Sequence, residues 1–363
     1  MPRLLVALSS HGYGHAAQTA PVVNALRARR ADVALTLATR LPYDFLAARF
    51  AGPFRYLPMD TDVGMVMGSA IDVKVRESLA AYRSFHRDWS GRVDEAAAAV
   101  ERDRADAVLA NVPYAMLEGA ARAGVPAVAM CSLNWADVFA HYAKRAGAGD
   151  QAEVRTIHAE IRTAYRAAEA FLRLTPGMPM PDLPRARTIG PVARLGRCDP
   201  AGLRARLGLE ANVPVVMIAP GGIELRLPVE GWPRASAHYV VPASWGVHRP
   251  GFTAFESLGL PFVDVLASSD GVVGKPGYGT FAEAACNGVP IVYVRRGDWP
   301  EEPALIGWMA KNARSAEIGR DALRHGAFGD EMERLRSLPA PRPPAPTGVD
   351  EAVRALLRLL DIR

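Results

Sequence analysis

Short apolar runs alternate along this chain with longer segments of helical character. Residues 4–8 (LLVAL) precede a glycine-rich turn and a helix that Pro21 opens, and residues 33–39 form the next apolar run. Runs this short, without strict polar alternation, are typical of strands that are buried on both faces of a parallel sheet. The same strand–helix–strand succession recurs between residues 107 and 130. The pattern predicts an α/β fold with parallel strands joined by crossover helices.

A proline-rich break separates two such series. Five prolines between Thr175 and Pro191 prevent a long helix, and the apolar run 213–219 begins a second set of strands. A chain of 363 residues also exceeds the size at which single hydrophobic cores usually stop growing. We therefore expect Rossmann-like domains at 1–180 and 190–338, followed by a proline-rich linker and a C-terminal helix within 339–363.

One stretch of the first half has no regular pattern. Residues 59–74 are rich in Gly, Asp and Met, and a helix is expected to follow over residues 76–102. An irregular segment of this length is a candidate loop over a cleft. It is equally consistent with an ordinary loop in solvent.

Composition narrows the class of protein. A net charge of +5 and a pI near 9.2 suit an anionic ligand and leave peripheral contact with an anionic membrane surface open. No basic run is interleaved with aromatic residues, so nucleic-acid binding is not expected. The widely spaced Cys131, Cys198 and Cys286 support neither a disulfide framework nor a zinc site. No apolar stretch approaches the ~20 residues of a bilayer helix and the N-terminus does not have the form of a signal peptide, so we expect a soluble cytoplasmic protein.

Two glycine-rich turns, one in each half, carry the candidate chemistry. Residues 10–15 (SHGYGH) follow the first strand, and residues 274–280 (GKPGYGT) follow the short apolar run 271–273. Turns between a strand and a helix direct backbone N–H groups towards anions. A P-loop is not supported, because Pro276 follows Lys275 and the G-x-x-x-x-G-K-[ST] spacing is absent. The two turns predict a ligand held in a cleft between the domains.

The second turn and the segment after it carry a resemblance. Beyond GKPGYGT the chain has Glu283, the run 287–290 (NGVP), the pair Arg295-Arg296 and the run 301–303 (EEP). This segment resembles the donor-binding half of GT-B glycosyltransferases and is especially similar to the glycosyltransferase-like region of plant L-arabinokinases. The N-terminal GYGH turn resembles the glycine-rich loop of the lipid-linked peptidoglycan N-acetylglucosaminyltransferase and of UDP-glycosyltransferases. The resemblance implies two Rossmann-like domains facing a cleft, with a C-terminal helix near the domain junction.

Residue roles follow from the resemblance, position by position. His15 falls where many inverting members keep a general base, and His11, in the same turn with Gly12 and Gly14, is the competing candidate. The positions that the resemblance places at the donor are Gly277, Tyr278, Gly279 and Thr280 at the diphosphate, Glu283 at the ribose, Glu301 and Glu302 at the sugar hydroxyls, and Gly221 and Gly222 in the loop after the first strand of the second domain. Glu283 would also favour the start of a helix without any ligand, and Gly221 and Gly222 would also suit a plain tight turn.

The expected reaction is inverting, metal-independent transfer of a sugar from a nucleoside diphosphate, with UDP preferred, to an acceptor that the sequence does not identify. No cofactor or metal is expected, and the D-x-D letters at residues 60–62 are interpreted as a coincidence in an irregular loop. Oligomeric state is left open. Two alternatives remain: a sugar-nucleotide-binding protein that no longer transfers, and a nucleotide-sugar epimerase of the same fold.

The chain departs from the family pattern at two positions. Asn111 stands where many members have an aspartate that orients the histidine, and an asparagine can orient the ring without supplying charge. Asp137, Asp106 or no residue at all are the substitutes considered. Glu302 stands in place of a glutamine, which leaves the donor sugar open. The aromatic residues Trp135, Trp299 and Trp308 are candidates for lining the site or for core packing.

Overall fold

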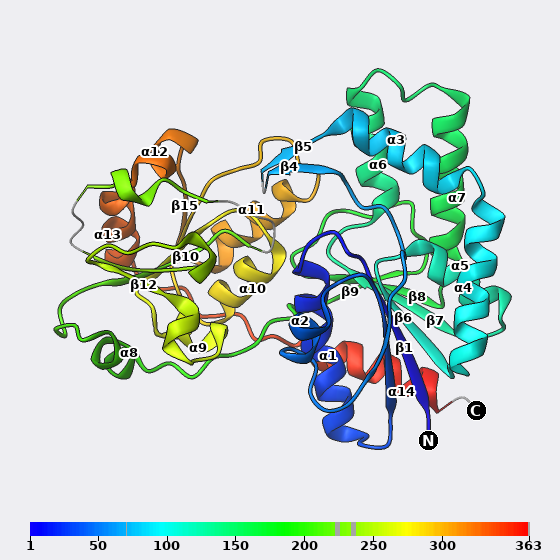
Figure 1. Ribbon diagram of the computed structural model, residues 1–363, viewed down its shortest axis with the longest axis horizontal. Coiled ribbons are helices and arrows are strands. Elements are labelled where there is room, and N and C mark those ends of the chain that lie inside the picture. The colour runs from blue at the N-terminus through cyan, green and yellow to red at the C-terminus, as the bar shows by residue number, and fades with distance from the viewer. Residues whose placement is uncertain (70, 222–225, 234–236, 362–363) are drawn as a thin grey trace.

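The computed structural model describes residues 1–69, 71–221, 226–233 and 237–361, which form two α/β lobes lying side by side (Figure 1). The N-terminal lobe contains β1 (Arg3–Leu8), α1 (Gly14–Arg29), β2 (Ala34–Ala38), α2 (Tyr43–Ala47), β3 (Arg55–Leu57), β4 (Met67–Ser69), β5 (Asp72–Val73), α3 (Val75–His86), α4 (Trp89–Asp103), β6 (Ala107–Asn111), α5 (Tyr114–Arg122), β7 (Ala127–Cys131), α6 (Trp135–Arg145), α7 (Ala152–Arg166), β8 (Ala170–Leu174) and β9 (Ala186–Ile189). The C-terminal lobe contains α8 (Pro200–Leu207), β10 (Val215–Ala219), η1 (Val229–Gly231), β11 (His238–Val241), η2 (Ala243–Trp245), β12 (Phe252–Ala254), η3 (Phe255–Leu258), α9 (Phe262–Ser268), β13 (Gly271–Gly274), α10 (Tyr278–Cys286), β14 (Ile291–Tyr293), α11 (Glu302–Asn312), β15 (Ser315–Glu317), α12 (Arg320–His325) and α13 (Gly329–Ser337), and the chain ends with α14 (Gly348–Leu360).

Each lobe is built on a wholly parallel sheet, as the short apolar runs predicted. The N-terminal sheet has the order β3-β2-β1-β6-β7-β8-β9, and the C-terminal sheet has the order β12-β11-β10-β13-β14-β15. The strands β1 and β6 are almost wholly buried because helices cover both faces of their sheet. Strand order reverses between β1 and β6 in one sheet and between β10 and β13 in the other. Ligands of open α/β sheets bind at the carboxyl ends of strands at such reversal points.

Three local expectations differ from the structure. The helix α1 begins at Gly14 rather than at Pro21, which lies inside it, so His15 belongs to the first helical turn. The helix expected over 76–102 is two helices, because the carboxylate of Asp88 accepts a hydrogen bond from the N–H of Gly91 and starts α4 afresh. The first sheet also extends past residue 180, since β9 forms its edge within the proline-rich stretch.

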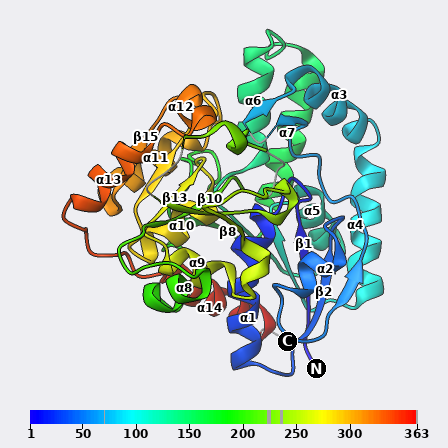
Figure 2. The same cartoon turned by 60° about the vertical axis from the view of Figure 1, so that its left-hand side comes forward.

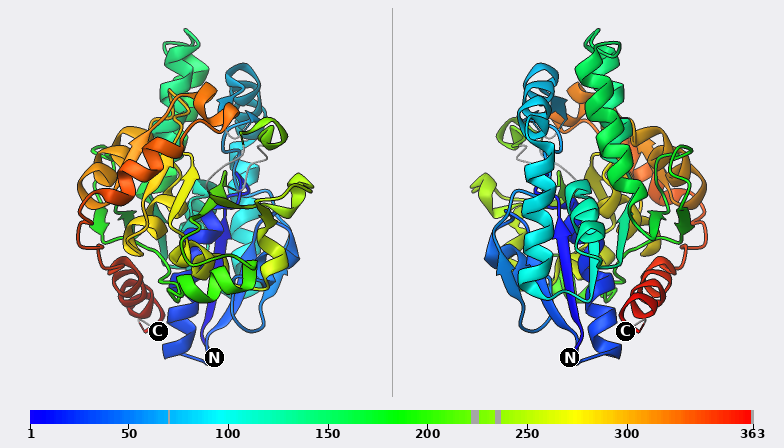
Figure 3. Two further views of the ribbon diagram at one scale, coloured as in Figure 1. Left: turned by 90° about the vertical axis from the view of Figure 1, so that its left-hand side faces the viewer. Right: turned by 90° about the vertical axis from the view of Figure 1, so that its right-hand side faces the viewer.

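The C-terminal helix α14 returns to the N-terminal lobe and packs against α1, β6 and β9. The two chain crossings between the lobes meet where it begins, because the N–H of Gly348 donates to the carbonyl of Pro191 at 3.0 Å. The N–H of Gly190 also donates to the carboxylate of Glu351 at 3.2 Å. Helix α1 lies at the junction, next to α10 (Figure 2). Both chain ends therefore lie on the same side of the molecule (Figure 3).

Further contacts join the lobes through the hairpin β4–β5 and helix α6. The hairpin β4–β5 of the N-terminal lobe reaches the C-terminal lobe, where Asp72 pairs with Arg320 at 3.1 Å. Tyr142 on α6 lies 3.4 Å from a carboxylate oxygen of Asp298, with which Arg145 also forms an ion pair. No helix among the described residues is long and apolar enough to span a membrane.

The substitution Leu356→Ala tests the contribution of α14. Leu356 is fully buried in the core that α14 shares with α1, and truncating a buried leucine costs about 2–5 kcal/mol of unfolding free energy. Urea unfolding followed by circular dichroism measures this loss. The exposed Arg358 on the same helix provides the control, and an Arg358→Ala variant as unstable as Leu356→Ala would contradict the assigned packing.

Candidate active site

His15 lies in the first turn of α1, next to the strand-order reversal of the N-terminal sheet. Its Nδ1 is 2.8 Å from Oδ1 of Asn111, the last residue of β6. Because an amide oxygen only accepts, this contact places the imidazole proton on Nδ1 and leaves Nε2 as the free acceptor. The amide nitrogen of Asn111 donates to Gln18 at 3.1 Å, and Gln18 donates to Ser132 at 2.8 Å. This chain of side chains fixes both the orientation and the tautomer of His15.

Burial keeps this imidazole neutral. His15 is only 5% exposed, and its burial lowers the pKa to about 4, although the hydrogen bond that His15 donates to Asn111 acts in the opposite direction. Neither aspartate considered as a substitute for the missing carboxylate lies in the right place. Asp137 is bound by Asn134 at the start of α6, and Asp106 accepts from the backbone of Arg3 at the opposite end of β6. Asn111 therefore orients His15 without any charge.

His11 packs between the lobes. Its ring contacts Trp135 edge-on at 5.2 Å and stacks on Trp299 of the C-terminal lobe at 5.8 Å. Its Nδ1 accepts a hydrogen bond from the N–H of Met65 at 3.2 Å. Burial, followed by the charges of His15, Arg296 and Lys275, lowers the pKa of His11 to about 3. Of the two histidines, His15 has the better placed free nitrogen.

Asp62 is a partly exposed carboxylate in this region that the sequence analysis set aside. Its oxygens accept hydrogen bonds from the hydroxyl of Ser9 at 2.9 Å and from the indole N–H of Trp135 at 2.7 Å. Burial raises its pKa to about 7, and these two hydrogen bonds only partly oppose that rise. Its neighbour Asp60 instead pairs with Arg40 at the surface. The sequence contains two aspartates in an irregular loop, and only the fold distinguishes the inward one from the outward one.

Trp135 connects these groups. Its ring is fully buried and lies 5.7 Å from that of His15 and 5.2 Å from that of His11, while its Nε1 holds Asp62. Trp135 therefore lines the site, and Trp299 closes it from the other lobe. Trp308, on α11, is instead partly buried against a different hydrophobic core.

The second glycine-rich turn leads into α10, as predicted. Gly277 precedes the helix and Gly279 lies against Ala17 of α1, where an added Cβ would be 3.8 Å from the alanine side chain. The N–H groups of the first helical turn, including that of Thr280, have no partner within the helix. The hydroxyl of Tyr278 points elsewhere: it donates to the carbonyl of Thr175 at 3.1 Å and accepts from the N–H of Val192 at 2.8 Å. Only the backbone of Tyr278 is therefore left for a ligand.

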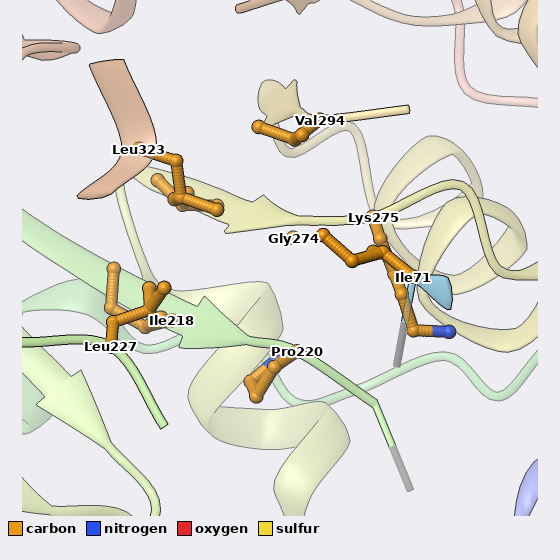
Figure 4. A pocket seen from close by; sticks show the side chains of 9 residues that line it. Ile71, Ile218, Pro220, Leu227, Gly274, Lys275, Val294 and Leu323 are labelled. Carbon is orange, nitrogen blue, oxygen red and sulfur yellow. The ribbon is translucent and has the colours of Figure 1, made fainter. Parts of the chain in front are cut away.

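Lys275 stands beside this turn at the strand-order reversal of the C-terminal sheet. Burial, and next the charge of Arg296, lowers its pKa to about 7. Among the described residues its ammonium has no ion-pair partner, and Gly221, with φ of +91°, lies against its side chain. Figure 4 shows the pocket that Lys275 shares with Ile71 of the hairpin; it is lined by Ile71, Ile218, Pro220, Leu227, Val273, Gly274, Lys275, Val294 and Leu323. Sequence analysis considered Lys275 only as part of a P-loop and missed it.

The three acidic residues of the predicted donor site differ in their partners. Glu283 is bound by Arg194 at 2.9 Å, and burial raises its pKa. Glu302 accepts from the N–H and from Nε of Arg296, at 3.0 and 3.1 Å, in a buried ion pair. Glu301 accepts from the indole of Trp299 at 3.1 Å and keeps one buried oxygen without a hydrogen-bond partner in the described part of the chain. Glu301 is therefore the free carboxylate, and Glu302 is a structural one.

The two lobes meet at one site. The charge of Glu301 acts on Cys131, whose Sγ lies 3.8 Å from Nδ1 of His15. In the first turn, the N–H of Gly12 donates to the carbonyl of Ser10, and open space surrounds Gly14 at the start of α1. Gly222 lies outside the described residues. No three His, Cys, Asp or Glu side chains of the described residues gather in a way that could hold a metal ion.

Comparison with solved structures identifies this architecture. The calicheamicin glycosyltransferase CalG4 superposes with a TM-score of 0.60 over 99% of this chain and 94% of its own, at 19% identity. The chain has the GT-B fold. The glycosyltransferase VinC in complex with DTDP gives 0.55 at 17% identity and covers 99% of both chains, and Phytolacca americana UGT2 complexed with UDP-2fluoro-glucose and pterostilbene gives 0.57 at 14% identity over 99% and 94%.

One curated protein is similar in sequence. Over 344 residues the chain is 28% identical to L-arabinokinase of Arabidopsis thaliana, an alignment that covers 91% of this chain and 32% of that protein. The chain thus spans about a third of the length of this relative. No protein-family model matches.

The stability difference between an Asp62→Asn variant and the wild type should depend on pH. The folded pKa of about 7 lies above the unfolded value of about 3.9, so ionised Asp62 destabilises the fold progressively between these values and fully above them. We expect the unfolding free energy of Asp62→Asn to rise by about 1–3 kcal/mol relative to the wild type between about pH 4 and about pH 8. This energy is reduced from the full value because Asp62 is partly exposed. Urea unfolding at both pH values measures the gain, Asp60→Asn is the control, and a pH-independent difference would refute the assignment.

Proposed function

We propose that this protein is a glycosyltransferase that moves a sugar from a nucleoside diphosphate, UDP by preference, to an acceptor hydroxyl with inversion at the anomeric carbon. The observation that carries the proposal is the contact of His15 Nδ1 with Asn111, which leaves Nε2 as the free acceptor. The charges of His15 and of Lys275, which belong to different lobes, both act on His11. A base on one lobe and an anion-binding turn on the other are the two groups that such a transfer requires.

The acceptor side of the reaction depends on His15. A neutral imidazole with a free Nε2 takes the proton of the acceptor hydroxyl as the oxygen attacks the anomeric carbon. Asn111 keeps Nε2 aimed into the site because it holds the Nδ1 proton. The bound acceptor meets an aromatic wall formed by Trp135.

The donor side depends on backbone amides and on Lys275. The diphosphate leaves with growing negative charge, which the N–H groups of Gly279 and Thr280 and the ammonium of Lys275 stabilise without a metal ion. The unpartnered oxygen of Glu301 accepts a hydrogen bond from a hydroxyl of the transferred sugar. Glu283 accepts a hydrogen bond from the ribose when the guanidinium of Arg194 moves away from its carboxylate oxygen.

The nucleotides bound to two structural neighbours, DTDP in VinC and UDP-2fluoro-glucose in UGT2, support a nucleoside diphosphate donor. One observation favours a second function. With a pKa of about 4 and no carboxylate on Nδ1, His15 is a weak base. A protein that binds nucleotide-sugars without turning them over would retain the cleft and tolerate this weakness.

The His15→Gln variant separates chemistry from binding. The glutamine amide can keep a hydrogen bond to Asn111 but cannot take a proton, so transfer or donor hydrolysis should fall by about 10²–10⁴-fold. UDP affinity measured by calorimetry should stay unchanged. Donors are first chosen by thermal shift against a panel of nucleotide-sugars. Full activity in His15→Gln would remove the base assignment, and binding without turnover in the wild type would favour the second function.

The Lys275→Met variant tests the diphosphate contact. Loss of one charged hydrogen bond should weaken UDP binding by about 1.5–3 kcal/mol, or roughly 10–100-fold. In the ligand-free protein the amine of Lys275 has a pKa of about 7, so it is mostly deprotonated at about pH 8. A bound diphosphate should raise this pKa, and Lys275 should then take up a proton from the buffer. Calorimetry in buffers of different ionisation enthalpy measures this uptake. Lys311→Met, on the exposed face of α11, should bind as the wild type does; equal affinity in both variants would exclude the contact.

A further inference from the structure

Asp62 and His15 share a contact with Trp135, and the family pattern gives Asp62 no role. Both groups lie against one indole: the ring of Trp135 is 5.7 Å from that of His15, and its Nε1 is 2.7 Å from the carboxylate of Asp62. Asp62 comes from the loop between β3 and β4, far in sequence from the end of β6 where the family keeps its aspartate. Here that position is the neutral Asn111.

Among the described residues, no cationic side chain pairs with Asp62, so a structural ion pair does not explain its position. Its hydrogen-bond partners are Ser9 and Trp135, and it forms no ion pair with any described residue. The other titratable groups that face it are three phenols: Tyr82 on α3, Tyr114 on α5 and Tyr165 on α7, whose pKa values its charge helps to raise. A poorly solvated carboxylate without a cation destabilises a fold, and ionisable groups with such strongly shifted pKa values cluster at functional sites.

We propose that Asp62 supplies the negative charge that stabilises the protonated imidazole of His15 during transfer, in place of the aspartate that Asn111 has replaced. This inference rests on the proposed function. As the acceptor oxygen bonds to the anomeric carbon, its proton passes to Nε2 of His15, and the bond from that carbon to the diphosphate oxygen breaks with its electron pair on the diphosphate. Asp62 exchanges no atoms; it is a positioning residue that acts through the electric field across Trp135.

The resting state is consistent with this division of labour. Without a substrate, His15 is neutral and Asp62, with a pKa of about 7, is close to its midpoint at neutral pH. A proton that arrives on His15 favours the ionised form of Asp62, because opposite charges in a poorly solvated site stabilise each other. The only other free carboxylate described at the site, Glu301, belongs to the opposite lobe and is held by Trp299.

The decisive experiment exchanges the carboxylate between two positions. Asp62→Asn should lower kcat by about a hundredfold and leave the KM for the donor unchanged, since charge stabilisation acts only in the transition state. We expect the kcat of the wild type to rise with pH with a midpoint near the Asp62 pKa of about 7, and this rise should disappear in Asp62→Asn. Asn111→Asp added to Asp62→Asn should recover roughly tenfold or more of the lost kcat, because it returns a carboxylate to Nδ1.

Two comparison variants separate this effect from general damage. Asp60→Asn removes a carboxylate two residues away that pairs with Arg40 at the surface, and it should keep the wild-type kcat and pH profile. Glu301→Gln should raise the KM for the donor and keep the rise of kcat with pH. An Asp62→Asn enzyme with the wild-type kcat and pH profile, or one that Asn111→Asp does not rescue, would overturn the proposal.

A measurement without turnover keeps the test independent of the proposed function. The ring nitrogens of His15, assigned by ¹⁵N NMR from the His15→Gln spectrum, should shift with a midpoint near the Asp62 pKa in the wild type and lose that response in Asp62→Asn. If the wild type neither transfers nor hydrolyses any donor, the glycosyltransferase assignment fails while this titration still decides the coupling. A His15 resonance that ignores the ionisation of Asp62 would refute the coupling itself.

Discussion

The indole of Trp299 fixes the relation of the two lobes, and the site depends on it. This side chain belongs to the C-terminal lobe but is buried in the core of the N-terminal lobe, where it stacks on His11. The guanidinium carbon of Arg296 lies 4.5 Å from the centre of the Trp299 ring, and Nε1 of Trp299 donates a hydrogen bond to Glu301. One aromatic contact therefore brings the free carboxylate of one lobe to the free imidazole of the other. An indole buries a large apolar area, which excludes water from the boundary between the lobes, and its single N–H group makes a directed hydrogen bond there.

Exclusion of water from this boundary sets the electrostatics of the site. Burial lowers the pKa values of His11, His15 and Lys275 and raises that of Asp62, with desolvation as the largest cause in every case. At neutral pH the two histidines are thus neutral in the absence of a ligand, whereas Asp62 and Lys275, each with a pKa of about 7, are close to half ionised. A charged diphosphate or a transferred proton would then meet dipoles and ionisable groups that are little screened by solvent, which is the condition under which fixed charges act most strongly.

The sequence predicted the architecture well and the side-chain network poorly. The fold class, both glycine-rich turns and the place of α10 followed from short apolar runs and punctuating glycines and prolines, which are local signals. The position of Asn111 beside His15 also followed, through the resemblance. The pairing of Glu302 with Arg296, the turn of Tyr278 towards Val192, and the inward direction of Asp62 did not. These interactions are contacts between side chains from different lobes or loops, and the periodicity of the sequence does not indicate such contacts.

The junction of the two chain crossings limits how the lobes can move. One crossing runs from β9 to α8 and the other from α13 to α14, and the hydrogen bond from Gly348 to Pro191 ties them together at a single place. Two connecting segments that are joined at one place form a hinge. They permit rotation of the lobes about this place and resist sliding or twisting of one lobe over the other. A rotation of the lobes about this junction would separate Trp299 from His11, and the reverse rotation would restore their contact.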